Sequence, residues 1–243
     1  YTLKSLVQQT AKNFIIWISA RPEEYNNPDI IELEKHIKSS GLNCIMTFDG
    51  LMYWDDKFSK DFYSRIKNIA RIGRKCWRTK NFSNFIGGAK QIFRDKNGLL
   101  EKRLTSALGN LKNYFSDTEY VYVTRIDSDD MFKNTAVEII QSIPLMTECL
   151  IFNKGLVYNK ETKELYEWVP RNNPPFHTII FKQDVFYDAK KYLEYFNGWK
   201  SHEDTPKIFT YQRLPDYHYC VLVHNKANQI STVWNHPFRG KEI

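Results

Sequence analysis

The segment Tyr120–Phe132, YVYVTRIDSDDMF, begins with aromatic and β-branched residues and ends in three carboxylates. Its first seven residues are typical of a buried β-strand. Asp127, Asp129 and Asp130 follow at once, and three like charges in so short a turn repel one another unless a cation lies among them. The segment therefore predicts a strand whose carboxyl end binds a positively charged group.

The sequence before this segment predicts a βαβ unit. Residues 13–19 (NFIIWIS) and 43–48 (NCIMTF) have the composition of short buried strands. Between them, Asn27 is a suitable N-cap, Pro28 suits the first helical turn, and Gly41 suits the end of the helix. A strand, a helix and a strand in this order indicate parallel strands with helices on the faces of the sheet.

Further helices and strands complete the expected fold. The apolar spacing predicts helices over residues 55–73, 99–115 and 184–198, and alternating residues predict a β-hairpin over 155–169. The first half of the chain alternates strands and helices, whereas the second half is mixed. We therefore predict a single α/β domain with a Rossmann-type mixed sheet flanked by helices.

Composition and charge limit the functional classes. Of the 243 residues, 42% are hydrophobic, which is enough for a sizeable core, and no apolar run approaches the roughly 20 residues of a membrane span. The four cysteines lack metal-ligand spacing, so we expect reduced thiols and a cytoplasmic protein.

The net charge of +7 is unevenly distributed, because no acidic residue occurs between Phe62 and Arg94. The basic stretch 65–94 is either a solvated surface or a contact for phosphate groups, a polyanionic acceptor or an acidic membrane surface. Since no recognised nucleic-acid-binding motif accompanies it, we expect no nucleic-acid partner.

The carboxylate cluster predicts a divalent metal ion. Asp127 and Asp129 lie at the carboxyl end of a predicted strand, where open α/β sheets bind ligands. Two such residues in an extended turn can reach one cation. Mg²⁺ and Mn²⁺ bind carboxylate oxygens, and substrate phosphates often complete their coordination. The alternative is that the aspartates only cap the helix that follows.

A family resemblance supports the metal interpretation. The segment RLTSALGNLKNYFSDTEYVYVTRIDSDDMF, which begins at Arg103, resembles the centre of GT-A glycosyltransferases, in which an arginine-bearing helix precedes a strand ending in a D-x-D metal motif. TRIDSDD and the later VHNKANQIST are most similar to the rhamnosyltransferase family of that superfamily. The resemblance covers Phe14 to Trp234. It implies a nucleotide-sugar-binding half at about 13–132 and an acceptor-binding half at about 133–243.

The resemblance also implies roles for individual residues. Asp129 would bind the metal directly, Asp127 would face the ribose or a metal-bound water and belong to the metal site, and His224 would help to bind the metal or diphosphate. Asp130 would support either aspartate or cap the next helix. The other residues implied in binding the donor nucleotide are Ser19, Arg21, Asp49, Arg103 and Ser128.

Sugar transfer with inversion needs a carboxylate that removes the proton of the acceptor hydroxyl. Glu203 and Asp204, in KSHEDTP, lie near a predicted helix start where GT-A enzymes often carry this base; Asp204 is favoured, and the alternative is that both acids only stabilise the helix N-terminus. The proline-containing loop after Trp168 is either a rigid connector or part of an acceptor pocket, because sugars bind against aromatic faces with polar edges. The predicted lining residues are Trp168, Arg171, Phe176 and His177.

The sequence therefore predicts a metal-dependent hexosyltransferase that moves a sugar from a nucleotide-diphosphate sugar to a carbohydrate acceptor. A metal-dependent nuclease or phosphotransferase also uses clustered carboxylates and a basic surface, although two-metal sites normally draw their acids from several segments. A non-catalytic protein that binds sugars or polyanions on the same fold is the third alternative.

Overall fold

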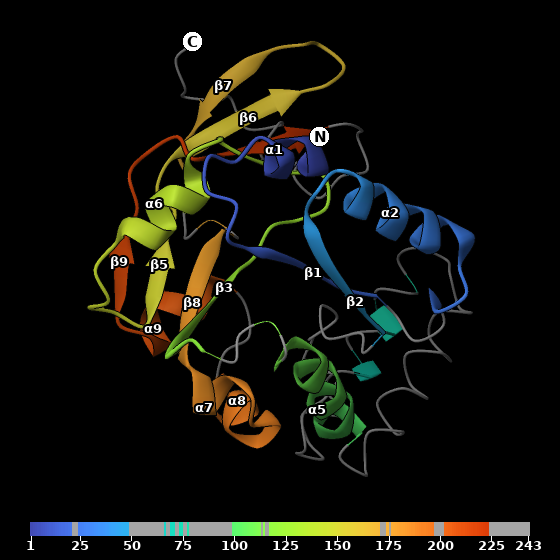
Figure 1. Ribbon diagram of the computed structural model, residues 1–243. Helices are drawn as coiled ribbons and strands as arrows, with labels where there is room; N and C mark the ends of the chain where they lie inside the picture. The colour runs from blue at the N-terminus through green and yellow to red at the C-terminus, as the bar shows by residue number, and fades with distance from the viewer. Residues whose placement is uncertain are drawn as a thin grey trace.

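The protein is described here by a computed structural model, in which the placed residues are 1–20, 24–48, 66, 69–70, 73–74, 77, 99–112, 114, 117–170, 174, 176–196 and 202–223. The predicted α/β class is confirmed: mixed sheets are flanked by helices (Figure 1). Within the described residues the strands form three sheets, of two, four and four strands, instead of the one predicted sheet.

The predicted βαβ unit is confirmed. β1 (Ile15–Ser19) pairs in parallel with β2 (Asn43–Thr47), and α2 (Pro28–Ser39) connects them. Asn27 caps α2 as predicted, because its Oδ1 accepts a hydrogen bond from the Asp29 N–H at 3.0 Å. The local signals in this part of the sequence were therefore sufficient to define it.

The second sheet contains the strand that precedes the carboxylates. β3 (Tyr120–Thr124) pairs antiparallel with β8 (His177–Lys182), and β8 pairs antiparallel with β5 (Cys149–Ile151). β5 in turn runs parallel to β9 (Tyr211–Arg213). Both β5 and nearly all of β8 are buried, which explains their continuous apolar composition.

Helices cover one end of these strands. α5 (Leu99–Lys112) packs against α8 (Ala189–Tyr195), and α7 (Gln183–Phe186) adjoins α8 (Figure 1). The predicted single helix over 184–198 is wrong, because the chain breaks at Asp188 and this side chain caps α8 by accepting the N–H of two following lysines. The buried apolar residues of α5 are Leu104, Ala107, Leu108 and Leu111.

The third sheet has the order β4 (Met131–Phe132), β10 (Tyr219–Val223), β6 (Gly155–Asn159) and β7 (Leu165–Trp168). The predicted hairpin is confirmed, because β6 and β7 pair antiparallel. β4 pairs antiparallel with β10 and therefore lies in a different sheet from β3. The short segment between β3 and β4, which carries the three aspartates, thus connects two sheets.

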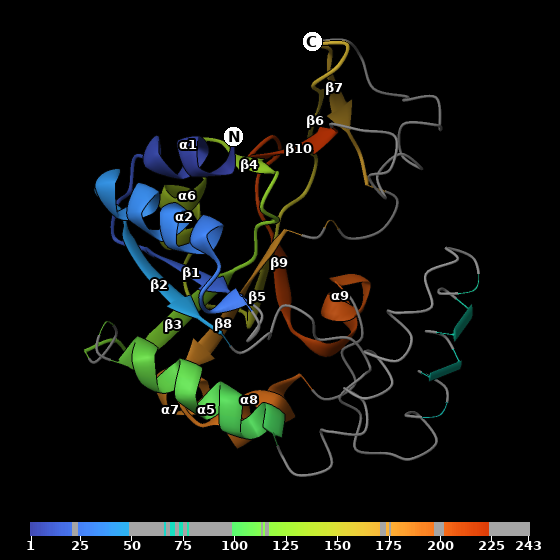
Figure 2. The same ribbon diagram turned by 90° about the vertical axis from the view of Figure 1, so that its right-hand side faces the viewer.

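The remaining described helices are α1 (Thr2–Val7), α6 (Ala136–Ser142), the 3₁₀-helix η5 (His202–Asp204) and α9 (Thr205–Ile208). Figure 2 shows α1, α2 and α6 on one side of the β3–β8–β5–β9 sheet and α9 on the other. Among the helices that the structure describes, none has the length and apolar character needed to cross a bilayer.

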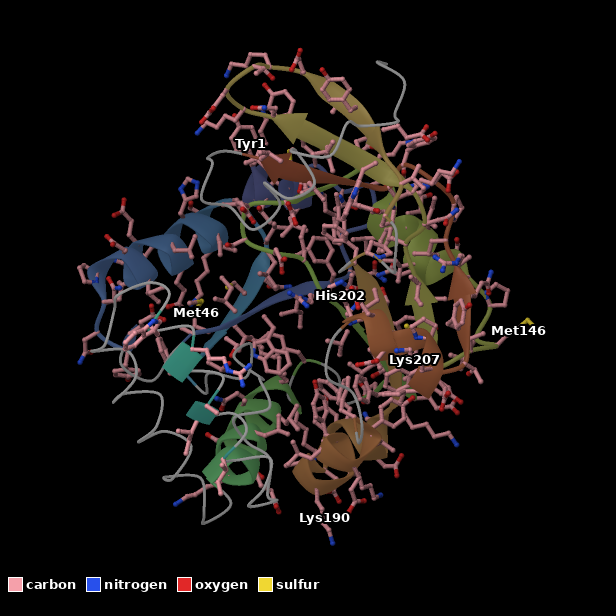
Figure 3. All side chains as sticks on the ribbon, turned by 180° about the vertical axis from the view of Figure 1, so that it is seen from behind. Tyr1, Met46, Met146, Lys190, His202 and Lys207 are labelled. Atoms are coloured by element: carbon pink, nitrogen blue, oxygen red, sulfur yellow. The ribbon has the colours of Figure 1, made fainter. Side chains whose placement is uncertain are left out.

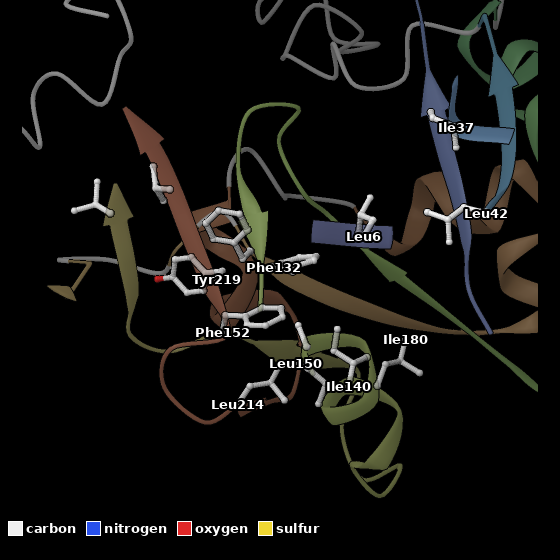
Figure 4. Packing of buried hydrophobic residues seen from close by; sticks show 14 of the residues in the cluster. Leu6, Ile37, Leu42, Phe132, Ile140, Leu150, Phe152, Ile180, Leu214 and Tyr219 are labelled. Atoms are coloured by element: carbon white, nitrogen blue, oxygen red, sulfur yellow. The ribbon is translucent and has the colours of Figure 1, made fainter. Parts of the chain in front are cut away.

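An aromatic cluster forms the core of the third sheet. Phe132 stacks on Phe152 with ring centroids 5.3 Å apart, and Phe176 stacks on Tyr219 at 4.2 Å. Figure 4 shows Leu6, from α1, on the side of Phe132 that faces α2. Phe132 lies two residues after Asp130 in sequence, so this core holds the chain directly after the three aspartates.

Candidate functional site

The carboxylate turn, which we define as Arg125–Asp130, is fixed to strands at both ends. The Arg125 N–H donates to the carbonyl oxygen of His177 in β8 at 3.1 Å. The Asp130 N–H donates to the carbonyl oxygen of Asp127 at 3.1 Å, which closes a β-turn. The first bond holds the start of the turn on β8, and the second fixes the internal geometry of the turn.

Arg125 provides a positive charge within the turn itself. Its Nε and Nη2 donate to Oδ1 of Asp127 at 3.2 and 3.0 Å. Both side chains are partly exposed, so the pair adds little stability, but it fixes the orientation of the carboxylate. Since both donors reach Oδ1, the other oxygen of Asp127 has no hydrogen-bond partner among the described residues and can bind a cation.

Asp130 points away from solvent, unlike Asp127. Its side chain belongs to a residue that is only 2% exposed, and its Oδ1 accepts the N–H of Leu222 in β10 at 3.0 Å. Burial raises the pKa of Asp130 to about 7; the Leu222 hydrogen bond opposes this shift, and the charges of Asp129 and Asp127 add to it. Asp130 therefore anchors the turn to β10 and neither caps α6 nor faces a ligand.

This anchoring role predicts a stability difference between two variants. Asp130→Ala should lower the free energy of unfolding by about 1–3 kcal/mol, because the buried N–H of Leu222 loses its acceptor. Asp130→Asn keeps an acceptor oxygen and removes a buried charge, so it should match or exceed the wild type at neutral pH. The folded-state pKa lies above that of an unfolded aspartate, so ionisation of Asp130 lowers stability as the pH rises from about 4 to about 7.

Urea unfolding in chelator-containing buffer, at about pH 5 and about pH 8, measures both effects. The wild type should lose stability relative to Asp130→Asn at the higher pH. Equal unfolding free energies for the alanine and asparagine variants would contradict the anchoring role.

The structure brings His202, which sequence reasoning missed, within electrostatic range of the carboxylate turn. Burial lowers the pKa of His202, the positive charge of Arg125 lowers it further, and the charges of Glu203 and Asp127 raise it. His202 therefore lies within electrostatic range of Arg125 and Asp127, near the centre of the molecule (Figure 3). A signal for it existed, because a histidine directly preceding two predicted catalytic acids is itself a candidate for contact with phosphate.

The two predicted catalytic acids differ in their surroundings. Asp204, the favoured candidate, accepts a hydrogen bond from Lys207 Nζ at 2.8 Å, and its side chain is 22% exposed. Glu203 is exposed and interacts electrostatically with the neighbouring His202. Glu203 is therefore the more accessible of the two carboxylates.

The structure describes only some of the other residues that are predicted to bind the donor. Ser19 ends β1 beside Thr47, and Ser128 is exposed in the carboxylate turn, where Asp129 is partly buried. Arg103 lies on α5, but its side chain is outside the described residues. The predicted site residues that lie wholly outside the described residues are Arg21, Asp49, Arg171 and His224.

The predicted acceptor pocket needs correction at two positions. Phe176 is 1% exposed and stacks on Tyr219, so neither of its ring faces is open to a sugar. His177 is 5% exposed within β8. Trp168, at the end of β7, is partly exposed and makes an edge contact with Tyr219 at 5.8 Å. Of the described candidates, only Trp168 offers a surface to an acceptor.

The residues of the turn fit a metal ion that the substrate helps to coordinate. In the described part of the chain, no three His, Cys, Asp or Glu side chains are grouped to hold a metal. Mg²⁺ and Mn²⁺, however, are commonly bound by one or two carboxylates, and water and substrate phosphates complete the coordination. Asp127 and Asp129, two carboxylates on one short and partly exposed turn, provide such a donor set.

No protein-family model, curated protein or solved structure matches this chain. The chemistry of the site is therefore the basis for a functional proposal.

Proposed function

We propose that this chain is a metal-dependent glycosyltransferase of the GT-A type, which transfers a sugar from a nucleotide-diphosphate sugar to a carbohydrate acceptor with inversion. The observation that carries the proposal is that His202, adjacent to Glu203, lies within electrostatic range of Asp127 and Arg125. In this proposal the residues suited to binding a cation and a residue suited to removing a proton would belong to one site, which sugar transfer requires.

The carboxylate turn would bind the donor diphosphate together with a divalent cation. When the sugar–phosphate bond breaks, the electron pair stays on the leaving diphosphate, and Mg²⁺ or Mn²⁺ would stabilise the added negative charge. Asp129 and the free oxygen of Asp127 are the groups that would hold the cation. Arg125 would keep Asp127 oriented through Oδ1.

Glu203 is the residue to which we assign removal of the acceptor proton, because it is exposed beside His202. Asp204 is the second candidate, since Lys207 already occupies one of its oxygens. His202, whose lowered pKa favours the neutral imidazole, could donate one hydrogen bond and accept another at the diphosphate or the acceptor.

A donor screen tests the proposal. Purified chain is mixed with uridine, guanosine and thymidine diphosphate sugars and Mn²⁺, and the release of nucleoside diphosphate is measured with and without EDTA. We expect metal-dependent hydrolysis of at least one donor. Glu203→Gln should reduce its rate by about 10²- to 10⁴-fold, which is the usual contribution of a general base, whereas the matched variant Asp204→Asn should have a smaller effect.

The same screen distinguishes the glycosyltransferase from the two alternative functions, a non-catalytic binding protein and a nuclease. Nucleoside diphosphate binding without turnover would indicate a non-catalytic binding protein. Metal-dependent cleavage of single-stranded DNA or RNA in a parallel assay would indicate a nuclease. If no nucleoside diphosphate binds in the presence of any divalent metal, the glycosyltransferase proposal fails.

A further inference from the structure

We propose that Thr2 is a positioning residue, through which α1 holds the carboxylate turn in the conformation that binds a cation. This inference rests on the proposed function. It concerns a residue that lies far from the turn in sequence and carries none of the site's charges.

The Thr2 hydroxyl contacts the backbone on both sides of Asp129. Its Oγ1 lies 2.7 Å from the carbonyl oxygen of Ser128 and 2.6 Å from that of Asp130, and its single proton is shared between these two acceptors. These two residues flank Asp129. The hydroxyl therefore fixes the backbone that carries the proposed metal ligand.

Two further polar side chains, Ser5 in α1 and Gln9 just after it, bind the backbone that follows the carboxylate turn. Ser5 Oγ accepts the N–H of Phe132 at 3.2 Å. Gln9 Nε2 donates to the carbonyl oxygen of Lys133 at 2.8 Å, and its Oε1 accepts the N–H of Val137 at 3.0 Å. Ser5 and Gln9 are 7% and 1% exposed, so these bonds are shielded from water.

The turn needs such support because its own charges oppose it. Repulsion among Asp127, Asp129 and Asp130 favours a more open turn, and the charges of the first two act on Asp130. Within the described turn, the Asp130 N–H bond to Asp127 is the backbone bond that opposes opening. From outside the turn, the Thr2 hydroxyl restrains the backbone on both sides of Asp129, in addition to the bonds that His177 and Leu222 make with the two ends of the turn.

Packing alone does not explain this arrangement. α1 has six residues, too few for a helix that is stable by itself. Leu6 is its buried hydrophobic residue, close to Phe132 in Figure 4. Leu3 and Val7 are only partly buried against the same core. Polar contacts to the backbone after β3 therefore add to the attachment of α1, and the two bonds of Thr2 are the ones that reach the neighbours of Asp129.

Two variants at Thr2 test the inference. Thr2→Val keeps the shape of the side chain and removes the hydroxyl, whereas Thr2→Ser keeps the hydroxyl. The affinity for Mn²⁺ alone is measured from the free ion by electron paramagnetic resonance. Hydrogen exchange of the peptide that contains the carboxylate turn is followed separately. We expect Thr2→Val to weaken Mn²⁺ binding by about three- to tenfold, the equivalent of one hydrogen bond, and to accelerate exchange at Asp130. Thr2→Ser should restore both.

Thermal unfolding of each variant distinguishes positioning from general stability. A purely structural role would lower the melting temperature of Thr2→Val and leave Mn²⁺ affinity unchanged. Equal Mn²⁺ affinity in the wild type and Thr2→Val would therefore overturn the inference, as would a serine variant that binds as weakly as the valine variant. In both cases the wild type still binds Mn²⁺. A wild type without Mn²⁺ affinity would instead overturn the proposed function, and this extension with it.

Discussion

Asp129→Ala is expected to reduce metal-dependent donor turnover by about a hundredfold to a thousandfold, which is the loss typical of removing one main electrostatic stabiliser of a leaving group. Asp129 is the proposed direct metal ligand and lies between the two carbonyl groups that contact Thr2. Without its carboxylate, Asp127 alone would hold the cation, and Arg125 already engages one oxygen of Asp127. Turnover is measured over a Mn²⁺ titration. The variant should need a higher Mn²⁺ concentration for half-maximal turnover and should have a lower maximal rate.

Asp130→Asn is the matched control for this variant. It removes one carboxylate charge from the same turn, but at a side chain that contacts Leu222 and not the site. Its turnover should stay within about threefold of the wild type, a change of less than about 1 kcal/mol in the barrier. If Asp129→Ala retains full turnover, or if both variants lose it equally, the assignment of Asp129 as metal ligand is wrong.

The parts of the fold that follow from local patterns were predictable. β1, α2 and β2 carry a cap, a proline at the helix start and two apolar runs, and each signal acts within a few residues. The hairpin formed by β6 and β7 follows equally from alternation around a short polar loop. The break between α7 and α8 was missed because the apolar spacing continues across it, while the cap at Asp188 competes locally with the helix.

The parts of the site that depend on long-range packing were not predictable. Sequence identifies the three aspartates, but only the position of β10 makes Asp130 an internal anchor, whereas Asp127 is partly exposed. His202 is far from Asp127 in sequence, so its electrostatic interaction with Asp127 and Arg125 does not follow from any local pattern. Phe176 stands among prolines and was predicted in a pocket, but its large apolar ring is more stable in the aromatic core.

Gly155→Ala is expected to lower the free energy of unfolding by about 1–3 kcal/mol, the usual consequence of forcing an extra methyl group into a packed core. A Cβ at Gly155 would lie 2.4 Å from two ring carbons of Tyr219. The ring has little room to move, because Tyr219 is 1% exposed, stacks on Phe176 and donates its hydroxyl proton to the Asn153 carbonyl oxygen at 3.0 Å. Urea unfolding measures the change.

Gly109→Ala is the matched control, because among the described residues no atom outside its own helix backbone and chain neighbours lies within 4 Å of the added Cβ, and the residue is in the helix α5. This variant should gain about 0.5–1 kcal/mol, since alanine favours the helix more than glycine does. If Gly155→Ala is as stable as the wild type, β6 does not pack closely on Tyr219.

The same substitution should also affect the carboxylate turn. Tyr219 begins β10, and β10 also carries the N–H group of Leu222 that donates to Asp130, so a shift of this ring should weaken Mn²⁺ binding at the turn. Gly109→Ala should leave Mn²⁺ binding unchanged, so the pair of glycine variants tests whether the aromatic core determines the geometry of the proposed metal site.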